Sequence, residues 1–114
     1  MRNYKQGEIV ILDFDPQAGH EQKGRRPAIV VSNDVFNRYS SVTLVCPITH
    51  TANNNPFRVE LGGASNIDGY VMCDQVRALD LTARNASFVE HAPKDVITEV
   101  VDVITAMIER GAGR

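Results

Sequence analysis

Short apolar runs separated by turn residues make up most of the chain before its C-terminal segment. The runs are rich in Val, Ile and Leu, which favours strands over helices. One run is continuous and is typical of a strand covered on both faces, whereas another alternates apolar and charged residues and predicts a half-exposed strand. The predicted strands are Glu8 to Phe14, Pro27 to Ser32 (the continuous run), Val42 to Ile48, Phe57 to Leu61 (the alternating run), one that begins at Tyr70 and runs to Val76, and a short one at Ser87 to His91.

The apolar spacing changes after Pro93. From Ile97 to Ile108 apolar residues recur at intervals of three and four, which predicts an amphipathic helix. Pro93 suits the first helical position and Gly111 suits the stop. The apolar stripe is wide, which indicates either deep docking on the rest of the fold or a share in a dimer interface. A second, shorter helical turn is expected at Asp34 to Tyr39.

These elements predict a mainly β fold, a small β-barrel with helices, in which five or six short strands are closed by the C-terminal helix. The pattern by itself does not choose between a barrel and a sandwich. No repeat and no linker divides the chain, and its length suits one domain, so residues 1–114 are expected to form a single domain.

Composition narrows the classes of function. Hydrophobic residues make up 43% and charged residues 23%, which is ordinary for a globular protein, and the net charge is −2. This charge argues against binding nucleic acid by bulk positive charge, because such binding depends on many phosphate contacts. A nucleic-acid enzyme of this composition has to concentrate its cations locally.

The two cysteines, Cys46 and Cys73, lie inside apolar runs and have no second Cys or His at ligand spacing. We therefore expect buried free thiols rather than a disulfide framework or a metal site. The first residues are polar, and no apolar stretch approaches the ~20 residues of a membrane span. The sequence thus predicts a cytoplasmic protein with no membrane association.

The local concentration of charge lies in the connection between the first two predicted strands, Phe14 to Pro27. It holds His20, Glu21, Lys23, Arg25 and Arg26, and long connections in compact domains are often functional. The alternative from composition alone is a solvated charged loop. Two further polar segments interrupt predicted strands: Thr49 after Cys46-Pro47-Ile48, and Asp74-Gln75-Val76-Arg77. For the second segment, the simpler interpretation is a structural hydrogen-bond network that ties this strand to the Phe14 to Pro27 connection.

Several of these segments together resemble the signature blocks of the MazF/PemK toxin family, in the same order and at matching intervals, from about Gly7 to Ile108. The segments are Asp13-Phe14-Asp15-Pro16, Gly19-His20-Glu21-Gln22, Gly24-Arg25-Arg26-Pro27-Ala28, Cys46-Pro47-Ile48-Thr49 and Asp74-Gln75-Val76-Arg77. The resemblance implies an SH3-like barrel that forms a homodimer. It also implies a toxin that cleaves single-stranded RNA with no metal and no other cofactor, and that a cognate antitoxin with a disordered acidic segment holds inactive.

The resemblance also implies residue roles. Arg26 and Thr49 correspond to the family's catalytic pair. Glu21 is the expected general base and His20 its chemical rival, since an unperturbed histidine titrates near ~6.5. The predicted products are a cyclic phosphate and a 5′-OH. The residues expected to bind substrate are Gln17, His20, Gln22, Lys23, Arg25, Asn53 and Gln75, although Asn53 to Asn55 can equally be a plain turn.

Two rival functions remain open at this point. A CcdB-like toxin has a similar barrel but binds DNA gyrase and needs no catalytic pair; its gyrase-contacting end is aromatic and apolar, whereas this chain finishes with the polar segment Glu109 to Arg114. A catalytically inactive member retained for RNA binding is the second, and the presence of both Arg26 and Thr49 argues against it. The RNA motif, the physiological RNA target, the antitoxin and the dimer geometry cannot be predicted from the residues.

Overall fold

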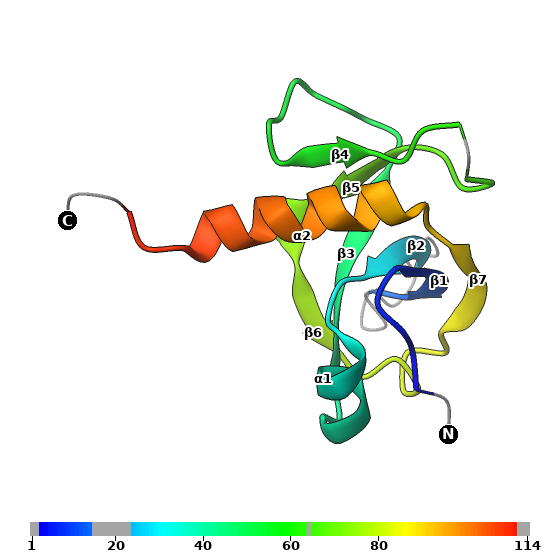
Figure 1. Ribbon diagram of the computed structural model, residues 1–114. Coiled ribbons are helices and arrows are strands. Elements are labelled where there is room, and N and C mark those ends of the chain that lie inside the picture. The colour runs from blue at the N-terminus through cyan, green and yellow to red at the C-terminus, as the bar shows by residue number, and fades with distance from the viewer. Residues whose placement is uncertain (1–2, 15–23, 64, 112–114) are drawn as a thin grey trace.

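The computed structural model describes residues 3–14, 24–63 and 65–111, and it shows a mainly β fold with a C-terminal helix (Figure 1). The predicted fold class is therefore confirmed. The elements are β1 (Glu8–Asp13), β2 (Arg25–Val30), α1 (Asp34–Tyr39), β3 (Thr43–Thr49), β4 (Arg58–Glu60), β5 (Tyr70–Met72), the 3-10 helix η2 (Cys73–Gln75), β6 (Arg77–Leu79), β7 (Ser87–His91) and α2 (Lys94–Ile108).

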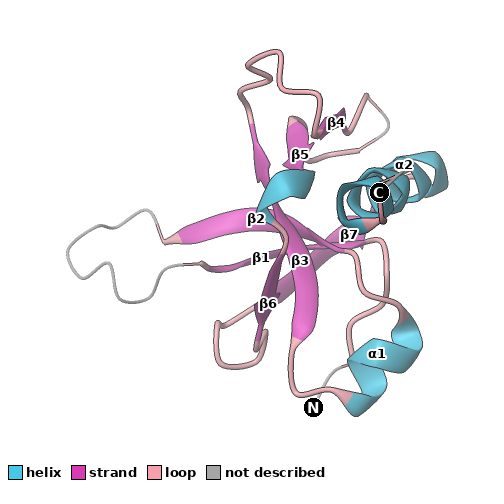
Figure 2. Cartoon of the chain, turned by 90° about the vertical axis from the view of Figure 1, so that its left-hand side faces the viewer, coloured by secondary structure: helices cyan, strands magenta, loops and turns pink. Residues whose placement is uncertain are grey.

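The strands form one antiparallel sheet in the order β4-β5-β3-β2-β1-β7, with β6 also paired to β3. β1 and β2 make a hairpin in which Leu12 lies opposite Arg26, and Figure 2 shows this hairpin extending away from the two helices. In the described part of the chain the pairings follow an open path, so that β4 and β7 end the sheet without pairing with each other. The sheet is bent rather than closed by a full ring of hydrogen bonds.

Strand β3 is the centre of the sheet because it changes partners along its length. Val45 to Pro47 pair with β2, while on the other edge its first half pairs with β6 and its last residues pair with β5. β5 and β6 thus share one edge of β3, and η2 loops out between them. The single strand predicted from Tyr70 to Val76 is wrong in its second half, because the chain leaves the ladder at Cys73 and returns to it at Arg77.

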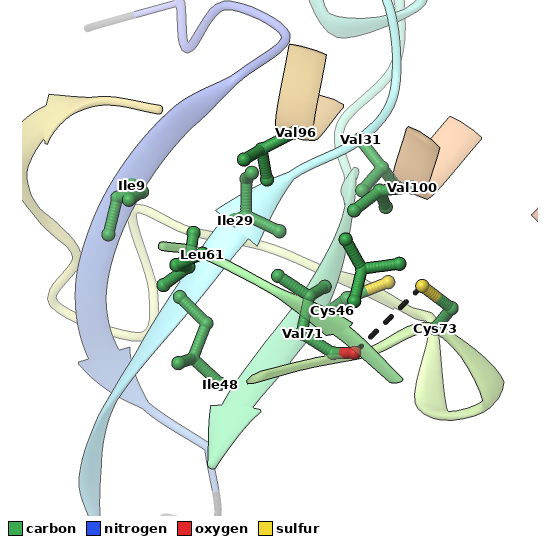
Figure 3. Close-up of a cluster of buried hydrophobic side chains, with 11 residues drawn as sticks. Ile9, Ile29, Val31, Cys46, Ile48, Leu61, Val71, Cys73, Val96 and Val100 are labelled. Atoms are coloured by element: carbon green, nitrogen blue, oxygen red, sulfur yellow. Dashed lines mark hydrogen bonds between the residues drawn. The ribbon is translucent and has the colours of Figure 1, made fainter. Parts of the chain in front are cut away.

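The core has two clusters, one packed between the sheet and α2 and a second that includes Val10, Val30 and Val45 but no residue of α2. In Figure 3 Val96 and Val100 of the helix face Ile29 and Val31 of the β2 segment, and all four side chains are buried. Farther along, α2 extends past the sheet (Figure 1), and Ile108 is 78% exposed. The first half of the apolar stripe of α2 therefore packs on the sheet, and its second half leaves apolar side chains exposed to solvent.

Local signals account for the helix ends. The predicted turn at Asp34 to Tyr39 is confirmed as α1, and the Asn33 side chain caps it by accepting the Phe36 N–H at 2.9 Å. Helix α2 begins at Lys94 with Pro93 as its cap, one residue later than predicted, and it ends at Ile108, before Gly111.

The predicted free thiols are confirmed: Cys46 and Cys73 are both buried and unpaired. In the described residues no helix is long and apolar enough to cross a membrane.

Candidate functional site

A cavity of about 350 Å³ opens between the start of β2 and the end of β3. Its volume is at the small end of the range for small-molecule sites, roughly 300–1,000 Å³. A cavity of this size has room for one phosphate and the atoms bonded to it. Eight described residues line it: Arg26, Pro27, Ile48, Thr49, His50, Asn66, Ile67 and Asp68. We call this cavity the β2–β3 pocket.

The register of the sheet explains why Arg26 and Thr49 meet there. β2 and β3 pair through Ala28 and Pro47, and the same register carried two residues further sets Arg26 opposite Thr49. The ladder between β2 and β3 ends at Ala28 and Pro47, before that position, while on its other edge β3 pairs with β5, where Thr49 lies opposite Tyr70. The pocket lies beyond the last pair of this ladder, and the next residues of both strands line it. The structure thus brings the two residues of the predicted catalytic pair to one cavity.

Arg26 lies within β2, paired with Leu12 of β1, rather than just ahead of the strand as the sequence indicated. Its backbone is therefore held in the ladder, while its side chain is exposed. Because successive side chains of a strand point to opposite faces, Arg25 points away from the pocket. A guanidinium on a fixed backbone can grip two phosphate oxygens at once, which suits Arg26 to an anionic ligand.

The neighbouring Arg25 has structural partners. Its Nη1 lies 3.2 Å from Asp13 Oδ1 and donates to the carbonyl of Asn85 at 2.9 Å, and its Nη2 donates to the carbonyl of Ile11 at 3.2 Å. Hydrogen bonds from Asn85 and Arg25 hold the pKa of the Asp13 carboxyl below its ordinary value. Arg25 thus ties the end of the β1–β2 hairpin to the turn before β7, and its predicted role in substrate binding stays a prediction.

Thr49 is positioned from two sides. Its Oγ1 accepts the backbone N–H of Thr51 at 3.3 Å, which leaves the hydroxyl proton available for a ligand. Gly69 packs against its backbone with φ at +120°, and a Cβ there would lie only 2.4 Å from the carbonyl oxygen of Thr49. Any larger residue at position 69 would displace the strand end that carries Thr49.

The opposite wall of the pocket is the segment from Asn66 to Asp68, and a glutamate from a distant strand anchors it. Glu90 of β7 accepts the backbone N–H groups of Asn66 at 2.8 Å and Ile67 at 3.0 Å, and it also accepts the Asn66 side chain at 3.1 Å. Asp68 Oδ1 then lies 3.5 Å from His50 Nδ1 across the mouth of the pocket. Sequence reasoning missed this wall; only the position of His50 directly after Thr49 pointed to it.

The other predicted site residues lie elsewhere. Asn53 is exposed in the turn between β3 and β4 with φ at 59°, a left-handed conformation typical of turns. Gln75 is exposed at the end of η2. Two residues later the Arg77 guanidinium lies 5.4 Å from the centre of the Phe14 ring, so the Asp74 to Arg77 segment contacts the end of the β1 segment. Neither Asn53 nor Gln75 lines the β2–β3 pocket. Five residues fall outside the described part of the chain: Gln17, His20, Glu21, Gln22 and Lys23.

A second cavity, of about 290 Å³, lies near the N-terminal segment and the turn after β6. Of the described residues that line it, Asp80 alone carries a charge, and that charge is negative. Phosphate needs cationic or N–H donors, so this cavity is unsuited to it. The β2–β3 pocket combines a cation, a hydroxyl and an imidazole, and it is the better candidate site.

Residues 5–108 match the model of the family described as "PemK-like, MazF-like toxin of type II toxin-antitoxin system". Among similar proteins, the Endoribonuclease PemK of Escherichia coli is 35% identical, over 91% of this chain and 81% of its own length. The Endoribonuclease toxin ChpB of Escherichia coli (strain K12) is 38% identical, over 93% of this chain and 95% of its own.

Solved structures give the same picture for the fold. A crystal structure of MazF from Deinococcus radiodurans superposes with a TM-score of 0.83 at 37% identity, covering 96% of this chain and all of that one (100%). A crystal structure of MazE-MazF from the same organism gives a TM-score of 0.82 at 31% identity, with 97% and 100% covered.

Proposed function

The chain belongs to the PemK-like, MazF-like toxin family of type II toxin–antitoxin systems, and from that premise we propose that it is an endoribonuclease toxin that cleaves single-stranded RNA without a metal ion. The observation that carries the proposal is the β2–β3 pocket, in which Arg26 and Thr49 line one cavity. Relatives named as endoribonucleases, including PemK and ChpB, support it.

The proposed reaction uses the ribose 2′-OH beside the scissile phosphate as nucleophile. The 2′ oxygen forms a bond to phosphorus, its proton passes to a general base, and the bond from phosphorus to the 5′ oxygen breaks. The leaving oxygen takes up a proton, so the products are a cyclic phosphate and a 5′-OH. DNA lacks the 2′-OH and cannot react in this way.

Arg26 is assigned to the charge that builds on the phosphorane. A guanidinium is a permanently charged, planar group, so Arg26 acts as a fixed positive charge rather than as a proton shuttle. Thr49 is assigned as a hydroxyl donor to a phosphate oxygen, because its own oxygen is already held by the Thr51 N–H. Loss of one such preorganised donor costs on the order of 10²–10³ in rate in other enzymes.

The general base is proposed to be Glu21, with His20 as the rival; both lie outside the described residues. Base recognition is proposed to involve exposed amides, among them Asn53 and Gln75, because single-stranded RNA presents its base edges to such groups. These assignments rest on the family resemblance. A cytoplasmic location likewise stays a prediction from the sequence.

Two partners belong to the proposal. The first is a cognate antitoxin whose acidic segment folds over the site, which the structures of MazE-MazF support by analogy. The second is a further copy of this chain in a homodimer. Part-exposed apolar residues on the second half of α2, ending at the 78% exposed Ile108, support such an interface.

The test is cleavage of a fluorogenic RNA oligonucleotide of mixed sequence in the presence of a chelator. Wild-type protein should cut it, and should leave a DNA copy intact. Arg26→Ala and Thr49→Ala should fold normally and lose cleavage, and Thr49→Val should lose it as well although the shape of the side chain is kept. Arg38→Ala, which removes an exposed arginine from α1, should keep the wild-type rate. Cleavage by Arg26→Ala or Thr49→Ala at the wild-type rate refutes the assignment.

The competing CcdB-like function is disfavoured because the chain matches the PemK-like, MazF-like family. A gyrase-binding toxin would also have no need of the Arg26 and Thr49 pair. It is separated by the same assay, because a gyrase-binding toxin releases no fluorescence from RNA. A catalytically inactive relative would give the same null result, and gyrase inhibition in vitro then distinguishes the two.

A further inference from the structure

A histidine–carboxylate pair also lines the β2–β3 pocket. His50 follows Thr49 at the end of β3, and its Nδ1 lies 3.5 Å from Asp68 Oδ1. Both residues line the same cavity as Arg26 and Thr49. With Nδ1 directed at the carboxylate, Nε2 is the ring nitrogen that can face a substrate.

Asp68 is exposed, with 82% of its side chain accessible, yet its backbone is fixed on both sides. Glu90 holds the two preceding residues through their N–H groups. Gly69, the next residue, is wedged against the carbonyl of Thr49. The backbone that carries the Asp68 carboxylate is therefore held in place beside His50, whose side chain is also exposed.

The proposed cleavage needs a proton for the leaving 5′ oxygen, and the groups already assigned supply it poorly. Arg26 carries a guanidinium, which is a fixed charge rather than a proton donor, and the Thr49 hydroxyl is a hydrogen-bond donor rather than an acid. Of the described residues that line the pocket, only His50 has a side chain whose unperturbed charge changes between about pH 5 and 8. Its charged neighbours in the pocket are Arg26 and Asp68.

We propose that His50 is the general acid of the reaction and that Asp68 is the positioning residue that holds its imidazolium; this rests on the proposed endoribonuclease function. In the step, the 2′ oxygen bonds to phosphorus as its proton leaves to the base in the first loop. The bond from phosphorus to the 5′ oxygen breaks, and the His50 Nε2 proton passes to that oxygen. Solvent then reprotonates the imidazole, and no oxidant, metal or further reactant is needed.

A pair of substrates separates this role from a structural one. The first is an RNA oligonucleotide, and the second is the same oligonucleotide with sulfur in place of the 5′ bridging oxygen at the scissile bond. A thiolate leaves without protonation, so the second substrate does not need a general acid. Rates are measured from about pH 5 to 9, a range that spans the ordinary histidine titration, with kcat and KM determined separately.

His50→Gln should lower kcat on the oxygen substrate by about 10²–10⁴, the usual contribution of a general acid or base, with little change in KM. It should also abolish the fall in rate at alkaline pH, and it should cut the sulfur substrate at the wild-type rate. Asp68→Asn should show a smaller loss on the oxygen substrate and none on the sulfur substrate. The matched control is His91→Gln, which removes a histidine outside the pocket that meets the Phe88 ring edge to face and lies 4.0 Å from Glu8, and it should match wild type on both substrates.

Each other result overturns the assignment. If His50→Gln keeps the wild-type kcat on the oxygen substrate, His50 is not the general acid. If its kcat falls equally on both substrates, His50 has a structural or binding role instead. A change in KM alone makes His50 a residue that contacts the RNA without protonating it. A wild-type protein that cuts neither substrate refutes the endoribonuclease proposal itself, and His50 with it.

Discussion

Gly69 offers a quantitative test of how the fold positions Thr49. In Gly69→Ala the new Cβ would lie 2.4 Å from the Thr49 carbonyl oxygen, whereas ordinary contact begins at 3.4 Å, so something has to move by about 1.0 Å (3.4 − 2.4). The obstacle is backbone, which does not swing aside as a flexible side chain does. A misplacement of about 1 Å at a catalytic group costs on the order of 10² in rate. The φ of +120° adds strain of roughly 1–3 kcal/mol to the folded state.

Two neighbouring glycines provide matched controls. Gly62 has φ at +81° but open space around a Cβ, and Gly63 has open space without a left-handed φ. Gly62→Ala should therefore lose stability but keep its cleavage rate, and Gly63→Ala should change neither. Single-turnover cleavage of the fluorogenic RNA gives the rate, and urea unfolding at one protein concentration gives the free energy of unfolding.

The reasoning fails if Gly69→Ala cleaves RNA as fast as Gly62→Ala does. That result would mean that the strand end carrying Thr49 accommodates a shift of this size without cost, and that close packing at position 69 does not hold the site.

Three further predictions concern the rest of the fold. Because the pKa of Asp13 is lowered by its partners, Asp13→Asn should lose a stabilisation that is present at neutral pH; acid unfolding should show this difference from wild type shrinking below about pH 4, as the pH falls through the folded-state pKa. Asn37→Ala should cost about 2–4 kcal/mol in urea unfolding, since it leaves the buried carbonyls of Tyr4 and Ser32 without their donor. Burial raises the pKa of the Cys73 thiol to about 11 and raises that of Cys46 as well, so mass spectrometry after treatment with iodoacetamide at neutral pH should find both unmodified until the protein is unfolded.

The strands and helices were largely predictable because their signals are local. β7 (Ser87–His91) and α1 (Asp34–Tyr39) were predicted with the bounds that the structure gives them. The continuous apolar run in β2 and the period of three and four in α2 come directly from which faces are buried. The break at η2 was missed, because Cys73 to Gln75 look like a continuation of β5 when the partner strand is not known.

The candidate site was predictable only in part. The residue types of Arg26 and Thr49, together with the order of the blocks around them, pointed to a guanidinium and a hydroxyl. Nothing in the sequence pattern indicated that Glu90 would fix the segment before Asp68, because that contact joins residues 24 positions apart. Likewise the end of the β2–β3 ladder at Ala28 and Pro47, beyond which the pocket lies, follows from pairing between strands rather than from either strand alone.

The sequence by itself determined the local structure and the chemical inventory: strands where apolar residues run or alternate, a helix where they recur every three or four, and a short set of residues able to hold a phosphate. Only the tertiary structure decided which of these side chains share a cavity. The physical reason is that side-chain periodicity is a property of a few adjacent residues, whereas the β2–β3 pocket exists because the fold brings together three segments that are distant in the chain, around Arg26, Thr49 and Asp68.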